Sequence, residues 1–453
     1  MLQIVENQRV FFNSQETKSR SFRITQLKKL KKALQDNEEK LYASISKDFS
    51  KSNFETYISE LMFVYRTIDE AIHRLPNWSR TKRVSTNMLN FPAKSYIIPE
   101  PLGVCLVIGA WNYPYLLTLS PLVAALAAGN TVVIKPSEMT AECSATLVAM
   151  FAENFDPSYI AVVEGGIPET TDLLSQKFDK IFFTGSTAVG KIVYEAAAKN
   201  LTPVTLELGG KSPVFVLEDC NLKMTVKRLV WAKFLNAGQT CIAPDYVLVH
   251  ESVEKEFLNL VKSEIEKEHL SIDNGNYTQI INQKNFNRLE ALIDSKKVFT
   301  GGQTNASNRV IEPTVLQNVT FIDNIMKDEI FGPILPVVSF TSLEEAIDNV
   351  QTLPKPLSCY VFTKSHSKKK EILNRISFGG GAVNEAVMHL SNHHLPFGGV
   401  GNSGIGNYHG EAGFRTFSHY KSILEKPTWI EFPLKYYPHT KGKLKWIKRF
   451  MKL

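Results

Sequence analysis

The sequence predicts an α/β protein with two doubly wound parallel-sheet lobes and a small β arm. Short β-branched runs alternate with helical segments in two series, one from Gly103 and one after Glu207. Such alternation is typical of parallel sheets that carry helices on both faces. The chain has 453 residues, too many for one hydrophobic core of ordinary size. We therefore expect more than one lobe.

The first lobe is expected to begin with helices and to continue with strand–helix pairs. Up to about Leu75, apolar residues recur at three- and four-residue spacing with charges between them. From Gly103, the runs VCLVIG, TVVIK and KIFFTG indicate buried strands separated by helices. Ligands of such sheets bind beyond the carboxyl ends of the strands. The loops after these three runs are therefore candidate sites.

The second lobe contains the expected strands SPVFVL, YVLVH, LPVVSF and SCYVFT. Residues 77–101 have a different character, because alternating residues and prolines indicate an extended hairpin or arm. After Phe397 the chain is rich in glycine and then extended again. We expect this late segment to pair with the earlier arm.

The composition argues against several kinds of site. The five cysteines are odd in number, widely spaced and without a CxxC pair. This pattern argues against a disulfide framework or a structural zinc site and favours a reducing compartment. The N-terminus lacks a basic region followed by an apolar run, so no secretory signal is expected. The histidines at 389, 393, 394 and 409 show no zincin spacing, and we expect no metal site.

The C-terminal segment HTKGKLKWIKRFMKL is strongly basic and contains no acid. On a helix, Leu444, Ile447 and Met451 would share one face, with Trp446 and Phe450 beside it. This pattern is typical of a helix that docks on an anionic membrane surface. The alternative is a solvated tail that packs against a partner subunit. The sequence leaves both interpretations open.

Cys241, in the stretch NAGQTCIAPD, is the first candidate for chemistry. Small, amide and turn-forming neighbours place it in a loop before a strand. A thiol nucleophile needs such access, but a lone cysteine is more often a core residue. For Cys105 and Cys359, which lie inside apolar strand runs, the core interpretation is preferred.

Glu207 and Asn112 are the candidate partners of that thiol. Glu207 lies between Leu206 and Leu208, where an ionised carboxylate is costly to bury. It is either paired with Lys211 or tuned as a base, and the two glycines that follow favour the base. Asn112 lies in the loop after a buried strand, where its amide is suited to donate to an oxyanion. Its alternative is an ordinary turn-capping role.

Several loops suit a nucleotide. FFTGSTAVG carries Gly185, Ser186 and Gly190 across a strand-to-helix turn. It is not a strict GxGxxG, but the N–H groups that open a helix can receive a phosphate. IKPSE offers Lys135 and Glu138 to ribose hydroxyls or phosphate. In EIFGPILPV, Glu329 and Phe331 flank a rigid turn.

Together these segments resemble the aldehyde dehydrogenase superfamily. WNYP, IKPSE, FTGSTAVGK, LELGGKSP, GQTC, EIFGP and PFGGVGNSG occur in the order of that family and cover nearly the whole chain. NAGQTCIAPDY, GNSGIGNYHG and the short N-terminus are similar to its class-three branch, which acts on fatty and aromatic aldehydes.

The resemblance implies a role for each matching residue. Cys241 is similar to the nucleophile, Asn112 to the oxyanion donor and Glu207 to the base that activates water. Lys135 and Glu138 match the adenosine-ribose contacts, and Glu329 with Phe331 matches the contacts to the nicotinamide. Gly185, Ser186 and Gly190 match the pyrophosphate turn, and Tyr113, Trp231 and His409 are expected to line the substrate tunnel.

The resemblance also implies the wider organisation of the protein. We expect an NAD(P)-binding domain at 1–82 and 99–206, a catalytic domain at 207–396, and a bridging arm at 83–98 and 397–453. The cofactor is NAD or NADP, and the partners are a small-molecule aldehyde and a second subunit, with no nucleic acid. The expected location is cytoplasmic, with peripheral membrane contact through the tail. The alternatives are a coenzyme-A-acylating enzyme of the same fold and a non-catalytic homologue.

Overall fold

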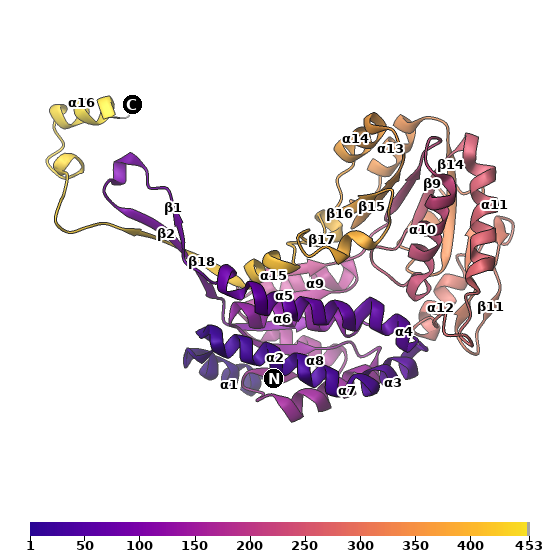
Figure 1. Cartoon of the computed structure of the whole chain (residues 1–453), viewed down its shortest axis with the longest axis horizontal. Coiled ribbons are helices and arrows are strands. Elements are labelled where there is room, and N and C mark those ends of the chain that lie inside the picture. The colour runs from indigo at the N-terminus through magenta and orange to yellow at the C-terminus, as the bar shows by residue number, and fades with distance from the viewer. Residues whose placement is uncertain (451–453) are drawn as a thin grey trace. The chain divides into compact units, whose positions relative to one another are not determined.

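The computed structural model describes residues 1–450 and divides the chain into two compact units. The larger unit comprises Met1–Trp78 and Pro101–His419, and the smaller one comprises Ser79–Glu100 and the chain from Tyr420 onward. Residues 397–419, expected in the arm, therefore lie in the larger unit, whereas residues 79–82 and 99–100, expected in the cofactor-binding domain, lie in the smaller one. The larger unit contains both expected parallel sheets (Figure 1).

The first sheet has six strands in the order β17-β7-β6-β3-β4-β5. Its bounds are β3 (Val104–Ile108), β4 (Thr131–Lys135), β5 (Ile160–Val162), β6 (Lys180–Thr184), β7 (Val204–Glu207) and β17 (Gly404–Ile405). All neighbours are parallel except β17, which pairs antiparallel with β7. β3, β4 and β6 are buried along their whole length, as expected of strands covered on both faces.

Helices surround this first sheet (Figure 1). They are α1 (Leu2–Asn13), α2 (Arg20–Asp36), α3 (Glu38–Phe49), α5 (Met62–Trp78), α6 (Leu116–Ala128), α7 (Ala141–Asn154), α8 (Ile167–Ser175), α9 (Thr187–Ala198) and α15 (Gly410–Thr416). α6 is apolar on nearly all sides because it lies between the sheet and the N-terminal helices, and almost every residue in it is buried. Gly129, with φ of 97°, ends it in the left-handed conformation.

The second sheet has seven strands in the order β10-β13-β14-β9-β8-β15-β16. They are β8 (Pro213–Val216), β9 (Tyr246–His250), β10 (Val298–Thr300), β13 (Thr314–Leu316), β14 (Ile334–Phe340), β15 (Ser358–Phe362) and β16 (Gly380–Val383). Only β10 is antiparallel to its neighbour. The accompanying helices are α10 (Leu222–Phe234), α11 (Glu251–Glu268), α12 (Gln283–Glu290), α13 (Leu343–Gln351) and α14 (His366–Arg375).

The smaller unit holds a three-stranded sheet in the order β1-β2-β18. Its strands are β1 (Lys82–Val84), β2 (Lys94–Pro101) and β18 (Ser418–Glu425), so the late segment does pair with the earlier hairpin. The unit ends in α16 (Lys441–Phe450). Met451 and Lys452, which the tail interpretation used, lie outside the described residues. Among residues 1–450, no helix has the length and apolar character needed to cross a membrane.

Candidate active site

The loop that carries Cys241 begins with a left-handed turn directly after α10. Asn236, Ala237 and Gly238 have φ values of 54°, 49° and 71°. A Cβ on Gly238 would lie 2.3 Å from the carbonyl oxygen of Gly332, so only glycine fits there. The Cys241 loop and the EIFGP turn are thus packed backbone against backbone.

Amide side chains join this loop to Asn112. The Asn112 Nδ2 donates to the Gln239 carbonyl at 3.1 Å, and the Asn236 Nδ2 donates to the Asn112 carbonyl at 2.9 Å. Asn236 Nδ2 also donates to the Gln239 carbonyl at 3.1 Å. A primary amide has two N–H donors, and among the described residues only one from Asn112 has an acceptor. The structure therefore brings Asn112 beside the Cys241 loop with one donor left for a ligand.

Cys241 keeps some solvent exposure, although dense protein surrounds it. Burial, together with the nearby carboxyl groups of Glu329 and Glu207, raises the pKa of the thiol to about 12. The thiol is therefore protonated near neutral pH in this structure. Both carboxyl groups that raise this pKa come from elsewhere in the chain, Glu207 from the end of β7 and Glu329 from the EIFGP turn.

Glu207, the last residue of β7, is 3% exposed, and neither carboxyl oxygen has a hydrogen-bond partner among the described residues. The interpretation that pairs it with Lys211 is wrong. Lys211 instead forms a buried ion pair with Asp245 and donates to the carbonyls of Ile325 and Asp328. Burial without a cation raises the pKa of Glu207 well above its ordinary value.

Glu329 lies over the glycine pair that follows Glu207. A Cβ on Gly209 would come within 2.1 Å of the Glu329 Oε2, so the glycine leaves room for this carboxyl group. Burial raises the pKa of Glu329 to about 8, and the charge of Asp245 adds to the effect. Phe331 has a φ of 50° and packs edge-to-face on Trp111 at 5.4 Å between centroids. The EIFGP turn is thereby held against the loop that carries Asn112.

The first sheet offers a second group of polar residues at the ends of β4 and β6. Lys135 is buried and donates to the Pro136 carbonyl at 2.7 Å and to the exposed Glu138 at 3.3 Å. Ser186 is the N-cap of α9 and accepts from the Val189 N–H. A Cβ on Gly190 would lie 2.6 Å from Leu208, so this glycine lets α9 approach the sheet closely.

These residues fit the dinucleotide that the resemblance implies. A capped helix N-terminus suits a pyrophosphate, and an exposed carboxylate with a lysine beside it suits ribose hydroxyls. The glycine contacts at 190 and 209 show that backbone and side chains approach one another closely where a ligand would bind.

The glycine-rich segment after Phe397 packs against the end of β7. Gly404 is the antiparallel partner of Glu207, and the Leu208 N–H donates to the Ser403 carbonyl at 3.1 Å. A Cβ on Gly404 would lie 2.5 Å from the Leu206 carbonyl oxygen. This segment therefore shapes the surroundings of Glu207, which is why it lies with the larger unit.

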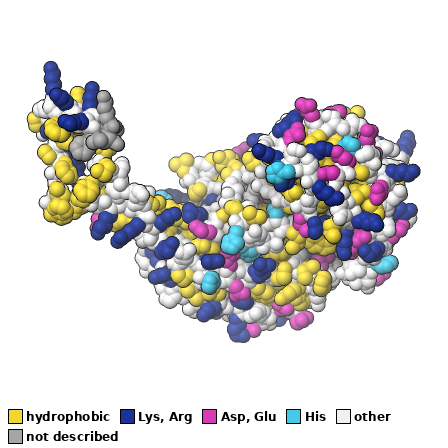
Figure 2. All heavy atoms as spheres, turned by 45° about the horizontal axis from the view of Figure 1, so that its top comes forward, with side chains coloured by type: hydrophobic (Ala, Val, Ile, Leu, Met, Phe, Trp, Pro, Cys, Tyr) yellow, Lys and Arg dark blue, Asp and Glu magenta, His cyan; other side chains and the backbone are white. Residues whose placement is uncertain are grey.

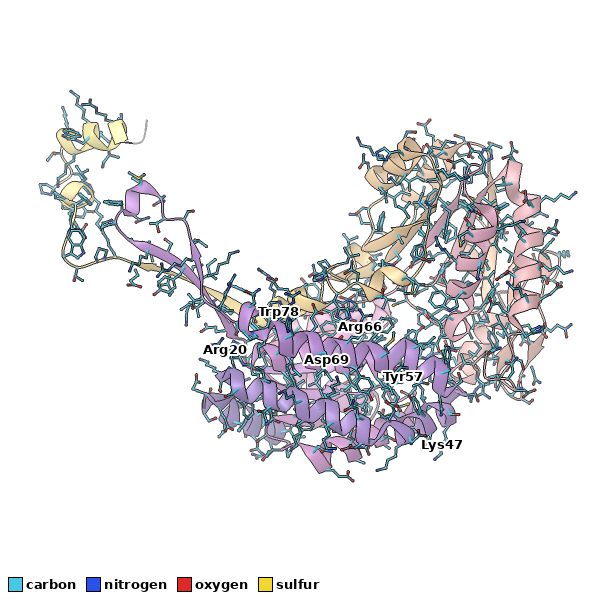
Figure 3. The ribbon with its side chains drawn as sticks, in the orientation of Figure 1. Arg20, Lys47, Tyr57, Arg66, Asp69 and Trp78 are labelled. Carbon is cyan, nitrogen blue, oxygen red and sulfur yellow. The ribbon has the colours of Figure 1, made fainter. Side chains whose placement is uncertain are left out.

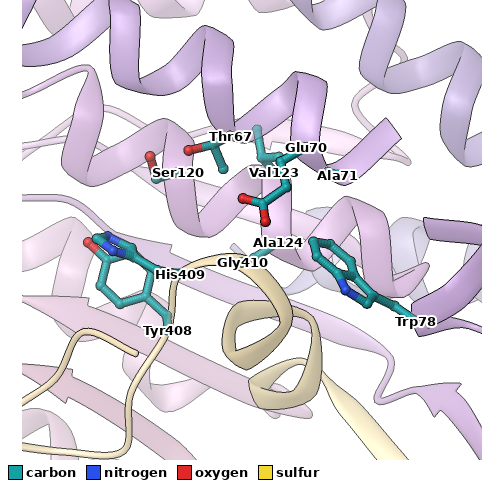
Figure 4. Close-up of a pocket in the computed structure, with 10 residues that line it drawn as sticks. All are labelled: Thr67, Glu70, Ala71, Trp78, Ser120, Val123, Ala124, Tyr408, His409 and Gly410. Carbon is teal, nitrogen blue, oxygen red and sulfur yellow. The ribbon is translucent and has the colours of Figure 1, made fainter. Parts of the chain in front are cut away.

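The three expected substrate residues are not found in one place. Tyr113 is buried, and its hydroxyl bonds the Thr240 Oγ1 at 2.6 Å, directly beside Cys241. Trp231 lies on α10 with 36% of its surface exposed. His409 lines a cavity of about 20 Å³ together with Thr67, Glu70 and Ser120 (Figure 4). That volume holds about one water molecule, so this cavity does not admit an aldehyde chain.

His409 is also part of a stack of rings. Its ring lies 5.1 Å from Phe397 and 6.0 Å from His393, and His393 bonds Glu70 at 2.7 Å. Burial lowers the pKa of His409 to about 3, so its imidazole is neutral at physiological pH. These contacts account for the position of His409 by packing, and its role toward substrate stays a prediction.

Sequence reasoning missed a set of buried charges behind the site. Lys51, Glu55 and Glu60 are buried and come from the helical N-terminal region, where the sequence showed only charges between apolar residues. Lys233 is 1% exposed at the end of α10, and burial lowers its pKa to about 8. The position of Lys233, three residues before the start of NAGQTC, was the one signal in the sequence that pointed toward it.

Comparison with known proteins identifies the family. The model of the aldehyde dehydrogenase family matches residues 3–423. A 4,4'-diaponeurosporen-aldehyde dehydrogenase of Staphylococcus aureus is 46% identical over 98% of this chain and 97% of its own. An aldehyde dehydrogenase family 3 member A2 of Pongo abelii is 43% identical over 99% and 93%. A dimeric, NADP-preferring aldehyde dehydrogenase of Canis lupus familiaris is 42% identical over 98% of each chain.

A solved structure agrees with these relatives. The substrate-bound state of Staphylococcus aureus AldH superposes with a TM-score of 0.97 at 45% identity, covering 99% of both chains. The expected fold class and the expected class-three relationship are confirmed. The chain therefore belongs to the aldehyde dehydrogenase family and is an oxidoreductase that acts on aldehydes with NAD or NADP.

Proposed function

We propose that this enzyme oxidises an apolar aldehyde, of medium- or long-chain aliphatic, aromatic or isoprenoid type, to its carboxylic acid through an acyl group carried on Cys241. The observation that carries the mechanism is the meeting of three groups. A partly exposed thiol lies in a loop that the Asn112 amide contacts with one of its two donors, and Glu207, a buried carboxyl group without a partner among the described residues, acts on the same thiol. The isoprenoid aldehyde in the name of the bacterial relative supports the substrate class.

The residues divide the reaction between them. The Cys241 thiol loses its proton to solvent water as its Sγ bonds to the aldehyde carbon, and the oxygen becomes an oxyanion that accepts from the Asn112 amide and the Cys241 backbone N–H. The C–H bond of that carbon then breaks as the hydride leaves, which gives a thioester on Cys241. The nicotinamide cofactor supplies the hydride acceptor when it is bound. Glu207 then takes a proton from the water that attacks the thioester, and the acid leaves as the thiol re-forms.

The cofactor is held by residues of both sheets. In this proposal Lys135 and Glu138 bind the adenosine ribose, and Gly185, Ser186 and the N-terminus of α9 bind the pyrophosphate, with Gly190 admitting the close packing. Glu329 and Phe331 hold the nicotinamide end. We accordingly propose residues 1–82 and 99–206 as the cofactor-binding domain and residues 207–396 as the catalytic domain.

Release of free acid tests the hydrolytic role of Glu207. Purified enzyme with NAD or NADP and a long-chain aldehyde is expected to give the carboxylic acid without coenzyme A. The Glu207→Gln variant should still release one equivalent of reduced cofactor in a burst and then stop. A product that forms only after coenzyme A is added would instead identify the acylating type. Tyr113→Phe and Trp231→Ala, profiled across chain lengths, test the substrate residues.

The smaller unit is the proposed site of homodimer formation. It exposes several large apolar side chains, namely those of Met88, Leu89, Phe91, Trp429 and Tyr437. β18 also lies at the edge of its sheet, and such an edge needs a partner or cover. The dimeric relative supports this assignment. Light scattering should give the mass of two chains, and a Leu89→Lys, Phe91→Lys variant should give one.

We also propose that α16 makes peripheral contact with a membrane from the cytoplasmic side. Leu444, Trp446 and Ile447 are exposed on this helix, and its charged residues are all basic. Figure 2 shows basic and apolar side chains together on this segment. Vesicles with anionic lipid should sediment the full chain but not a chain ending at Thr440, whereas zwitterionic vesicles should sediment neither. Equal sedimentation of both chains would reject the contact.

A further inference from the structure

Lys51 is an ammonium group buried deep in the protein. Its side chain has no exposure, and its Nζ donates to the Glu60 Oε1 at 2.9 Å. The same Nζ lies 4.1 Å from the centre of the Tyr113 ring, within the range of a cation–π contact. Lys51 follows α3 and precedes the short helix α4 (Asn53–Thr56). It therefore ties the N-terminal helical layer to the loop that carries Asn112.

Glu60 lies in a π-helical turn, η2 (Tyr57–Leu61), whose first residue is labelled in Figure 3. Its second oxygen, Oε2, accepts from the backbone N–H groups of Tyr115 at 2.8 Å and Leu116 at 3.2 Å. These are the N–H groups that open α6, where a carboxylate is favoured. Insertions of this kind in a helix occur frequently at functional sites. One carboxylate thus anchors the end of the Asn112 loop.

Tyr113 and Glu55 carry the connection on to Cys241. The Tyr113 hydroxyl bonds the Thr240 Oγ1 at 2.6 Å, and Thr240 precedes Cys241. The Glu55 Oε1 accepts from the Asn236 N–H at 2.8 Å, at the left-handed turn that begins the Cys241 loop. Buried charges of the N-terminal helical region therefore hold both loops of the site, Glu60 at the Asn112 loop and Glu55 at the Cys241 loop.

We propose that Lys51 and Glu60 are positioning residues, whose buried ion pair holds the Asn112 loop so that the Asn112 amide meets the substrate oxyanion. The inference rests on the proposed function, because it needs Asn112 as the oxyanion donor. An ion pair of this kind is weak evidence for stability, since apolar replacements of both partners are often tolerated. Its placement gives it a different role, because it contacts the Tyr113 ring and the N-terminus of α6.

The experiment compares two double variants that each remove both charges. Lys51→Met with Glu60→Leu removes the ion pair and the acceptor for the α6 N–H groups. Lys51→Met with Glu60→Gln removes the ion pair but keeps an amide oxygen as acceptor. We expect kcat to fall between about tenfold and a hundredfold in the leucine variant, because small misplacements of a catalytic group cost this much. The glutamine variant should lose less, and NAD binding should not change in either.

An Asn112→Ala background shows whether the loss passes through Asn112. Removal of an oxyanion donor by itself costs about 10² to 10³ in kcat. If the ion pair acts by placing Asn112, either double variant should lose little further activity on this background. The full loss recurring on Asn112→Ala would overturn the inference and leave Lys51 and Glu60 with a structural role only. Unchanged kcat in the leucine variant would overturn it as well.

Two controls complete the test. Lys32→Met removes a cation from the exposed Lys32–Asp36 pair of the same helical layer, and it should leave kcat unchanged. If the leucine variant does not fold, the loss of kcat in the glutamine variant is compared instead, with and without Asn112→Ala. Failure of the proposed function itself is distinguishable, because Asn112→Ala and Cys241→Ala would then remain active with the ion pair intact.

Discussion

The buried ammonium of Lys211 pairs with Asp245 and leaves Glu207 without a cation. Lys211 follows Glu207 closely in LELGGK, but its side chain is directed to the end of the Cys241 loop. Asp245 in turn accepts from the Ile330 N–H at 2.8 Å, so the ion pair joins three loops of the site. Burial alone therefore raises the pKa of Glu207, the base in the proposed mechanism.

Replacing Glu207 by Gln should abolish acid release and make the protein's stability less dependent on pH. The folded pKa of Glu207 is raised above the unfolded value of 4.5. The contribution of Glu207 to the free energy of unfolding is fully present below pH 4.5. It is lost as pH rises from 4.5 toward the folded pKa, because the carboxyl group ionises first in the unfolded chain. The loss is about 1.4 kcal/mol per pH unit. Above pH 4.5, the melting temperature of Glu207→Gln should therefore rise relative to that of the wild type.

A matched control is Glu142→Gln, which removes an exposed carboxylate that pairs with Lys47. This variant should follow the wild-type melting temperature at every pH. If the melting temperatures of Glu207→Gln and the wild type changed with pH in the same way, a buried and unpaired Glu207 would be contradicted.

The sequence predicted the parts of the site that depend on local pattern. Asn112 follows β3 and Glu207 ends β7, at the carboxyl ends where parallel sheets place their ligands, and buried runs such as VCLVI are strands. The Cys241 loop instead follows α10 and precedes β9, so that rule does not place it. The partner of Lys211 was not predictable, because the choice between Glu207 and Asp245 depends on how the loops cross in space. The pattern of residues along one sequence does not specify how these loops cross.

The charges behind the site were missed for a related reason. Glu60 belongs to a helical pattern with charges between apolar residues, and Lys51 lies between α3 and α4, so the local sequence showed no sign that either is buried. Contacts distant in sequence bury them, at the start of α6 for Glu60 and over the Tyr113 ring for Lys51. The sequence pattern also did not predict which residues belong to the arm. Residues 404–405 have the glycine-rich sequence of a loop, yet they add a strand beside β7, so this segment lies with the larger unit.

Neutralising Glu329 should make the Cys241 thiol more reactive in alkaline solution. The carboxylate of Glu329 is one of the charges that raise the pKa of Cys241. Its own pKa is about 8, so its negative charge appears only above that pH. Alkylation of Cys241 by iodoacetamide should be faster in Glu329→Gln than in the wild type at pH 9, and each unit of lowered pKa adds about tenfold. Equal rates at pH 9 would contradict this coupling.

Removing the charge of Glu138 should shift the cofactor preference toward NADP. Glu138 is exposed beside the buried Lys135, and its carboxylate would repel a 2′-phosphate while accepting from a 2′-hydroxyl. Glu138→Gln keeps the shape and leaves Lys135 as the local charge. We expect the ratio of kcat/KM for NADP to that for NAD to rise about tenfold, which corresponds to about 1.4 kcal/mol. An unchanged ratio would show that Glu138 does not contact the adenosine ribose.

Substituting Gly238 should damage the site more than the fold. A Cβ at this position would lie 2.3 Å from the Gly332 carbonyl oxygen, and the φ of 71° adds strain to any other residue. Gly238→Ala should therefore push the Cys241 loop away from the EIFGP turn, lowering kcat/KM by about a hundredfold or more. Ala237→Gly is the control, because φ at 237 is 49° and glycine relieves strain there. It should keep its melting temperature and most of its activity. Full activity of Gly238→Ala would show that the loop tolerates displacement, and equal losses in both variants would show that the Cβ clash at 238 is not the cause.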